Sequence, residues 1–85
     1  MEERFDEIEQ RVKEVIKRVL QVNEENIKRE TTIAELGGDS LAVLGILSAL
    51  EQEFDITIPD DNARQIESFA SAVKVIRGRL NLQGT

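Results

Sequence analysis

At the centre of the chain stands the stretch Glu35-Leu36-Gly37-Gly38-Asp39-Ser40-Leu41. Its two consecutive glycines tolerate backbone angles that other residues avoid, so they predict the end of one structural element. The carboxylate of Asp39 can accept the N–H groups of a first helical turn. Because the chain is apolar and periodic from Leu41 to Phe54, we predict a helix from Ser40 to about Phe54, with Asp39 as its N-cap.

Ser40 is the residue of chemical interest in this stretch. At the first position of a helix, its hydroxyl lies outside the core, on a rigid element, near the positive end of the helix dipole. An anion would be favoured there, because the first amides of a helix are available to bind it. On Asp39 and Ser40 alone, however, a plain helix cap is the stronger interpretation, so the wider context has to decide.

The predicted helix from Ser40 to Phe54 has two different sides. At 100° per residue, one side collects an apolar stripe that we assign to the core: Val43, Ile46, Leu47, Leu50 and Phe54. Leu41 lies on the opposite side, and Leu44 lies off the stripe beside Gly45, Ser48 and Gln52. Two exposed leucines next to Ser40 predict a contact surface, since apolar patches rimmed by polar groups mark such sites.

A first helix is predicted over about residues 3–20. Its apolar residues follow helical spacing: Phe5, Ile8, Val12, Val15, Ile16, Val19 and Leu20. Acidic residues cluster at its start and basic residues at its end, which complements the helix dipole. We interpret these charges as a solvated face.

The connection from Gln21 to Gly38 contains one recognisable turn. Thr32 and Glu35 have the spacing of a capping box, which predicts an apolar turn over residues 33–36, closed by Gly37. The sequence leaves open whether the two helices joined by this connection run parallel or antiparallel.

Two more helices are predicted after the central one. Asp60 can cap a brief helix that extends to about Ile66, and Ser68 can cap a last helix that runs to about Leu80. Gly78 weakens the end of this last helix, so we expect it to fray there.

These elements predict an all-α fold, a small four-helix bundle of three longer helices and one short one. A chain of 85 residues is long enough for a single thin core. We therefore expect a single domain over residues 1–85, with an ordered core over about 3–80 and a mobile tail over 81–85.

Composition narrows the function. The chain has no histidine and no cysteine, so no imidazole can activate Ser40 as a nucleophile, and no His or Cys can bind a metal. We expect no catalytic residue and no metal site.

The net charge of −6 argues against binding to nucleic acid and favours basic partners. We see no signal peptide and no stretch that could insert into a membrane, so the default compartment is the cytoplasm or, after import, an organelle matrix.

The motif over residues 36–41 resembles the attachment motif of acyl and peptidyl carrier proteins. The resemblance continues from the first helix to Leu80, and residues 49–60 look like the second helix and following loop of fatty-acid-type carriers. It implies that a phosphopantetheinyl transferase attaches 4′-phosphopantetheine from coenzyme A to Ser40, beside Asp39. The thiol of this arm would carry an acyl group as a thioester for acyl-transferring or synthase enzymes. We expect a monomer that is a carrier and not an enzyme.

Two further groups of residues are assigned a function: one to bind partner enzymes and one to hold the acyl group. The partner-binding residues are predicted to be Leu41, Leu44, Gly45, Ser48 and Glu51. An acyl pocket is predicted between the second helix and the short third one, formed by Ile46, Leu47, Leu50, Ile66 and Ala72. The pocket is inferred from these aliphatic side chains and from a short helix that little holds in place, which should open at low cost in free energy.

Two positions depart from the fatty-acid-type pattern. Such carriers usually have acids two and five positions after the serine, where this chain has Ala42 and Gly45. Its acids on this helix come later, at Glu51 and Glu53. The paired glycines and residues 41–44 favour a peptidyl carrier, whereas residues 49–60 favour an acyl carrier.

We prefer a specialised free-standing acyl carrier for fatty-acid, lipid or polyketide-type synthesis. A stand-alone peptidyl carrier and a helical interaction module without a prosthetic group are the alternatives. A third function, that of a serine hydrolase, is poorly supported, because the chain offers no base that could activate Ser40.

Overall fold

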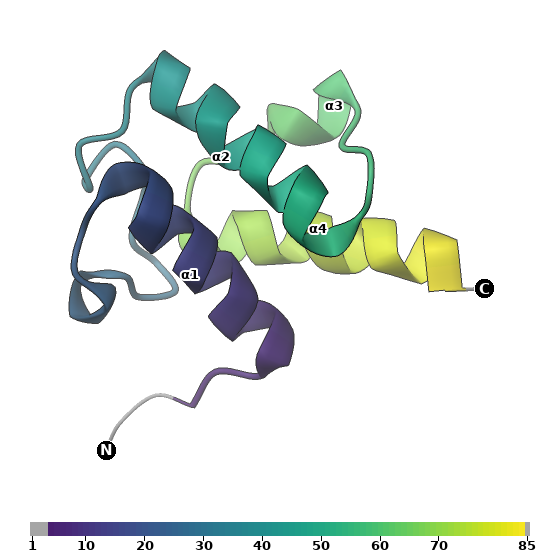
Figure 1. Cartoon of the computed structure of the whole chain (residues 1–85), viewed down its shortest axis with the longest axis horizontal. Coiled ribbons are helices and arrows are strands. Elements are labelled where there is room, and N and C mark those ends of the chain that lie inside the picture. Colours follow the sequence, from purple (N-terminus) through teal and green to yellow (C-terminus); the bar gives the residue numbers. More distant parts are fainter. Residues whose placement is uncertain (1–3, 85) are drawn as a thin grey trace.

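The computed structural model describes residues 4–84, and they form an all-α fold (Figure 1). In chain order the elements are α1 (Glu7–Leu20), the 3-10 helix η1 (Glu24–Asn26), α2 (Ser40–Phe54), α3 (Asp60–Ala63) and α4 (Phe69–Gly84). Across residues 4–84 the only β-type pairing is an isolated antiparallel bridge between Thr32 and Ser68. The predicted bundle of three longer helices and one short one is confirmed.

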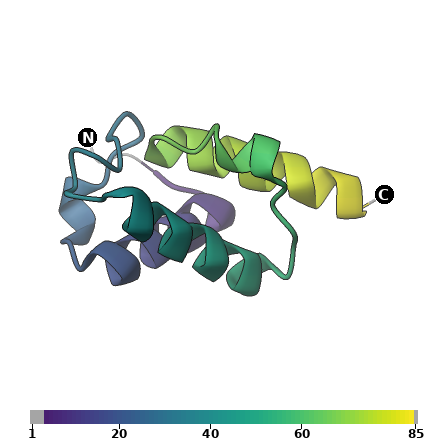
Figure 2. The same ribbon diagram turned by 90° about the horizontal axis from the view of Figure 1, so that it is seen from above.

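The helices lie in two layers, with α1 and α2 in one and α3 and α4 in the other (Figure 2). The two helices of the first layer are antiparallel, because Arg11 near the start of α1 pairs with Glu53 near the end of α2. One hydrophobic cluster lies between the layers, and its buried members are Val12, Val15, Ile16, Ile27, Ile33, Ile46, Leu50, Phe54, Ile56, Ile58, Ile66, Phe69, Ala72, Val73, Val75 and Ile76.

The start of α1 differs from the prediction. The helix begins at Glu7, because Asp6 and Glu9 form a capping box that the apolar periodicity does not reveal. The Asp6 carboxylate accepts the Glu9 N–H at 2.8 Å, and the Glu9 carboxylate accepts the Asp6 N–H at 3.0 Å. The expected first residue, Glu3, lies outside the described residues, but Arg4 and Phe5 are not helical.

The two last helices also differ at their ends. No side chain caps α3, which begins at Asp60 and ends at Ala63, before Ile66. In contrast, α4 continues through Gly84, so the predicted end of the last helix at about Leu80 was wrong. Fraying after Gly78 and a mobile tail from residue 81 stay predictions. Nothing lies within 4 Å of the position that a Cβ of Gly78 would take, whereas Leu80 packs against the core. Packing therefore continues the helix past a residue of low helix propensity.

Residues 29–33 cap the start of α4 with their backbone. The Phe69 and Ala70 amides donate to the carbonyls of Thr31 and Arg29, each at 3.0 Å. The Ser71 amide donates to the Ser68 hydroxyl at 3.1 Å, which confirms Ser68 as a cap. A helix start needs such acceptors from elsewhere, because its first amides have none within the helix.

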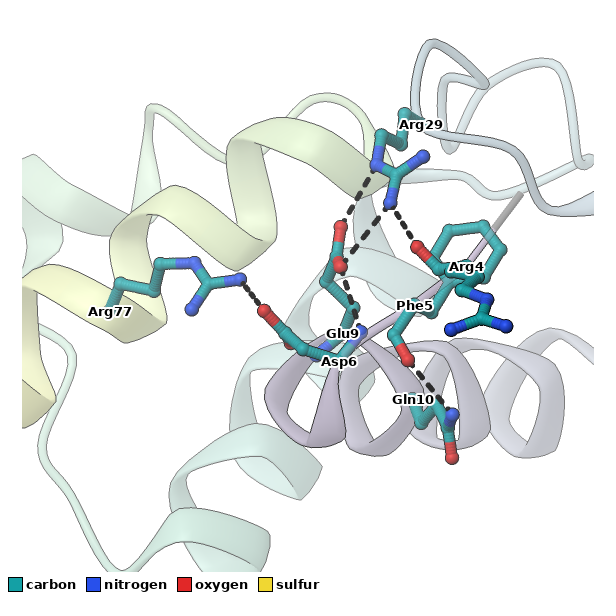
Figure 3. A network of polar contacts seen from close by, with 7 residues as sticks. All are labelled: Arg4, Phe5, Asp6, Glu9, Gln10, Arg29 and Arg77. Atoms are coloured by element: carbon teal, nitrogen blue, oxygen red, sulfur yellow. Dashed lines mark hydrogen bonds and ion pairs between the residues drawn. The ribbon is translucent and has the colours of Figure 1, made fainter.

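A polar network ties the N-terminal segment to this loop and to α4 (Figure 3). Arg29 donates to both Glu9 carboxylate oxygens, at 3.0 and 3.3 Å, and to the Arg4 carbonyl at 2.6 Å. Arg77 of α4 pairs with Asp6. The Arg29 guanidinium also lies 4.6 Å from the centre of the Phe5 ring, so it holds this segment by charge and by packing.

These contacts shift the acidities of both carboxyl groups. Hydrogen bonding from Arg29 is the largest cause that lowers the pKa of Glu9 below its usual 4.5. The Glu9 amide, followed by Arg77, lowers the pKa of Asp6 below its usual 3.8. Because both pKa values are depressed by folding, the two groups contribute stability that is complete above their unfolded pKa values and is lost as the pH falls through the folded ones.

We predict that Glu9→Gln lowers the free energy of unfolding by about 1 kcal/mol at neutral pH. Glutamine can still complete the capping box, but it has no charge for Arg29. The difference from the wild type should shrink below about pH 4.5, where Glu9 of the unfolded chain becomes protonated. Urea denaturation between pH 7 and pH 3 measures it. The control is Glu7→Gln, which removes one charge from the same turn; equal effects of the two changes would contradict the role of Arg29.

Candidate functional site

Hydrogen bonds between Thr32 and Glu35, the predicted capping-box pair, hold the turn before α2. The Thr32 hydroxyl accepts the Glu35 N–H at 3.1 Å, and the Glu35 carboxylate accepts the Thr32 N–H at 2.9 Å. Hydrogen bonds from the Thr32 amide and hydroxyl lower the pKa of Glu35 below its usual 4.5. Gly37 then closes the turn with a φ of +86°, a conformation that favours glycine. The capping box and the role of Gly37 are confirmed.

Gly38 is small for a different reason from the one predicted. It does not have a positive φ, and its amide donates to the Ile33 carbonyl at 2.9 Å. A Cβ at this position would lie 2.4 Å from Cγ2 of Ile33 and 3.3 Å from Cδ2 of Leu20. Gly38 therefore allows a close approach to the core. The sequence gives no signal for this contact, because its partners lie five and eighteen residues away.

Asp39 and Ser40 lie as predicted. The Asp39 carboxylate accepts the Ala42 N–H at 2.8 Å, and its carbonyl accepts the Val43 N–H at 3.0 Å. Such a cap contributes about 1 kcal/mol. Ser40 is the first residue of α2 and is exposed. The amides of Ser40 and Leu41 precede the first amide that the helix itself can satisfy, so they are placed to bind an anion on the serine.

The outer side of α2 is apolar near Ser40. Leu41 and Leu44 are 76% and 61% exposed, and Gly45 and Ser48 are exposed as well. A Cβ on Gly45 would lie 3.4 Å from Cγ1 of Val19, so this glycine belongs to the contact between α1 and α2 as well as to the surface.

The acids at the end of α2 have partners within the chain. The Glu51 carboxylate accepts the Ile58 N–H at 2.8 Å and so holds the segment that leads to α3. Glu53 forms an ion pair with Arg11 at 2.9 Å, and its carbonyl accepts a second bond from the same guanidinium at 2.7 Å. Sequence analysis assigned Glu51 only to partner binding and missed this structural contact. Its binding role stays a prediction.

The five residues assigned to an acyl pocket belong to one packed cluster. Ile46, Leu50, Ile66 and Ala72 are buried, and Leu47 is partly buried against them. The structure thus brings together residues from α2, from α4 and from the segment between α3 and α4. An acyl chain would have to part these side chains to enter. The short α3 contributes no buried residue of its own and has no side-chain cap, so it is the element that can yield most easily.

Comparison with known protein families shows to which family the chain belongs. A family model described as a phosphopantetheine attachment site matches residues 10–76. The chain belongs to this family. Its members carry 4′-phosphopantetheine as a covalently attached prosthetic group and interact with phosphopantetheinyl transferases and synthase enzymes. The matched residues begin in α1 and end in α4, so they include Ser40 and the whole turn before it.

The residues at the start of α2 fit this prosthetic group. An attachment residue needs an exposed hydroxyl, and its phosphate is favoured at a helix start. Ser40 meets both conditions, whereas the hydroxyls of Ser68 and Ser71 are hydrogen-bonded to each other and to nearby backbone.

None of the helices within residues 4–84 has the length and apolar character to cross a membrane.

Proposed function

We propose that this chain is an acyl carrier that holds 4′-phosphopantetheine on Ser40. The observation that carries the proposal is the exposed Ser40 at the first position of α2. It follows a turn held by hydrogen bonds, and it lies within the residues that match the family of phosphopantetheine attachment sites. When bound, the arm supplies a thiol that forms thioesters, while the chain supplies attachment, orientation and recognition.

The attachment step uses only the hydroxyl of this chain. The Ser40 oxygen forms a new bond to the pantetheine-bearing phosphorus of coenzyme A, and the phosphorus–oxygen bond of the pyrophosphate breaks. Adenosine 3′,5′-bisphosphate leaves, and the hydroxyl proton passes to a base of the transferase. The free amides of Ser40 and Leu41, at the start of α2, would favour the negative charge of the phosphodiester.

The uncharged start of α2 supports a second candidate, a peptidyl carrier. Ala42 and Gly45 leave this part of the helix without acids. Incubation with an acyl-activating ligase and with an aminoacyl-adenylating enzyme would separate the two functions, since the cargo appears as an added mass on the arm. We further propose that the carrier acts as a monomer in the cytoplasm.

Ser40→Ala is predicted to abolish modification and leave the fold intact. Asp39 still caps the helix, so the lost hydroxyl changes stability little. Intact mass after incubation with coenzyme A and a broad-specificity phosphopantetheinyl transferase measures the reaction. Thr57→Ala, which removes the hydroxyl of an exposed residue between α2 and α3, should be modified like the wild type. A mass gain on the Ser40 variant would refute the assignment.

We also propose that a short acyl chain enters the cluster between α2 and α3. The acylated form should then show changed amide shifts at Leu47, Leu50 and Ile66 relative to the form with a free thiol, because the chain must part these residues. Two-dimensional NMR of both forms measures this. A form carrying a two-carbon acetyl group serves as the control, since so short a chain does not reach the cluster. Changes confined to the surroundings of Ser40 would mean that the chain stays in solvent.

Partner enzymes are proposed to bind the exposed leucines of α2. Leu41→Ala or Leu44→Ala should weaken binding by on the order of 1–3 kcal/mol, because each removes an apolar anchor beside Ser40. The complex should depend only weakly on salt, since charges that steer association are absent from this part of the helix. Titration calorimetry against the transferase at several salt concentrations measures both, with Gln52→Ala as the control. Steep salt dependence with tolerance of both leucine changes would instead favour a surface of acids that includes Glu51.

A further inference from the structure

Gly38 lies at the point where the turn before α2 meets the core. Its amide donates to the Ile33 carbonyl at 2.9 Å, and Ile33 is buried. The space where a side chain would begin is filled: Cγ2 of Ile33 would be 2.4 Å from a Cβ, and the Ile33 carbonyl oxygen would be 3.1 Å from it. The backbone of Gly38 therefore rests directly on Ile33.

Ile33 cannot easily move away from this contact. Its amide donates to the Glu67 carbonyl at 2.9 Å, which ties it to the segment before α4. Its carbonyl accepts both the Gly38 amide and, at 3.1 Å, the Leu36 amide. The side chain is only 3% exposed, so neighbouring core residues surround it. Because Ile33 is held in place, a side chain added at residue 38 would push the backbone of residue 38 away from Ile33.

That displacement would reach Ser40, which is two residues further along. Ordinary contact between carbon atoms needs about 3.5 Å, so a Cβ on Gly38 would have to shift by about 1 Å relative to Ile33. We propose that Gly38 and Ile33 are positioning residues for modification: their contact sets where the hydroxyl of Ser40 lies relative to the rest of the carrier. This inference rests on the proposed attachment at Ser40.

The test is the rate of modification of Gly38→Ala with coenzyme A and the transferase, below the melting temperature of the variant. We expect kcat/KM to fall on the order of tenfold to a hundredfold, since a misplacement of about 1 Å can cost that much in rate. The loss should fall mainly on kcat. The variant keeps the side chains of Leu41 and Leu44, which are proposed to bind the transferase, and only the reacting hydroxyl of Ser40 is misplaced. A second change, Ile33→Leu, should restore most of the rate. It keeps the volume of the side chain but removes the methyl group on Cβ that meets residue 38.

Two controls separate positioning from stability. Ile76→Val weakens the core in α4 and should leave the rate per folded molecule unchanged, even where its melting temperature matches that of Gly38→Ala. Gly78→Ala adds a methyl group where nothing lies within 4 Å and should also be modified like the wild type.

Modification of Gly38→Ala at the wild-type rate, a loss no larger than that of Ile76→Val, or no restoration by Ile33→Leu would each overturn the inference. If Gly38→Ala alone does not fold, the double variant decides: it should fold and be modified, and its failure would also overturn the inference. None of these outcomes bears on the proposed attachment at Ser40, which fails if the wild type is not modified or if Ser40→Ala is modified.

Discussion

Three backbone hydrogen bonds between residues 29–33 and the segment 67–70 are the constraint on which the rest of the structure depends. They join the long connection after α1 to the start of α4, through the amides of Ile33, Phe69 and Ala70. Each bond serves two purposes, because it satisfies a backbone group that would otherwise lack a partner and it holds the connection in one place. The turn that follows starts from this anchored point, so α2 begins at a defined position relative to both layers.

Several charged residues of the chain hold different parts of the fold together. It has 17 acidic and 11 basic residues, yet Asp6, Glu9 and Glu53 pair with arginines of other elements. Glu51 accepts a backbone amide before α3. A negative net charge therefore does not locate a surface for basic partners, since several of its acids already have partners within the chain. What remains on α2 after Ser40 is two exposed leucines, in a stretch over residues 40–50 that contains no acid.

Small residues decide how closely the parts of the site approach one another. Gly38 rests on Ile33, and Gly45 lies against Val19 where α1 and α2 meet. Gly37 supplies the one backbone conformation of the turn that other residues avoid. The start of α2 is thus held by contacts and hydrogen bonds on its inner side, while Ser40 and Leu41 stay open to solvent. The proposed attachment at Ser40 needs this combination, because an attachment residue must be accessible to the transferase and still lie at a constant place.

The sequence by itself determined the features that depend on neighbours within about four residues: the start of α2 after its cap Asp39, the turn between Thr32 and Glu35, the cap at Ser68 and the apolar stripe by which α2 packs on the core. Side-chain caps and helical periodicity are local, so they can be read from spacing. The tertiary structure alone decided that α4 passes Gly78, that Glu51 holds Ile58, and that Gly38 must be small because Ile33 lies against it. These features depend on residues brought together by the fold, for which the order of amino acids along the chain carries no local signal.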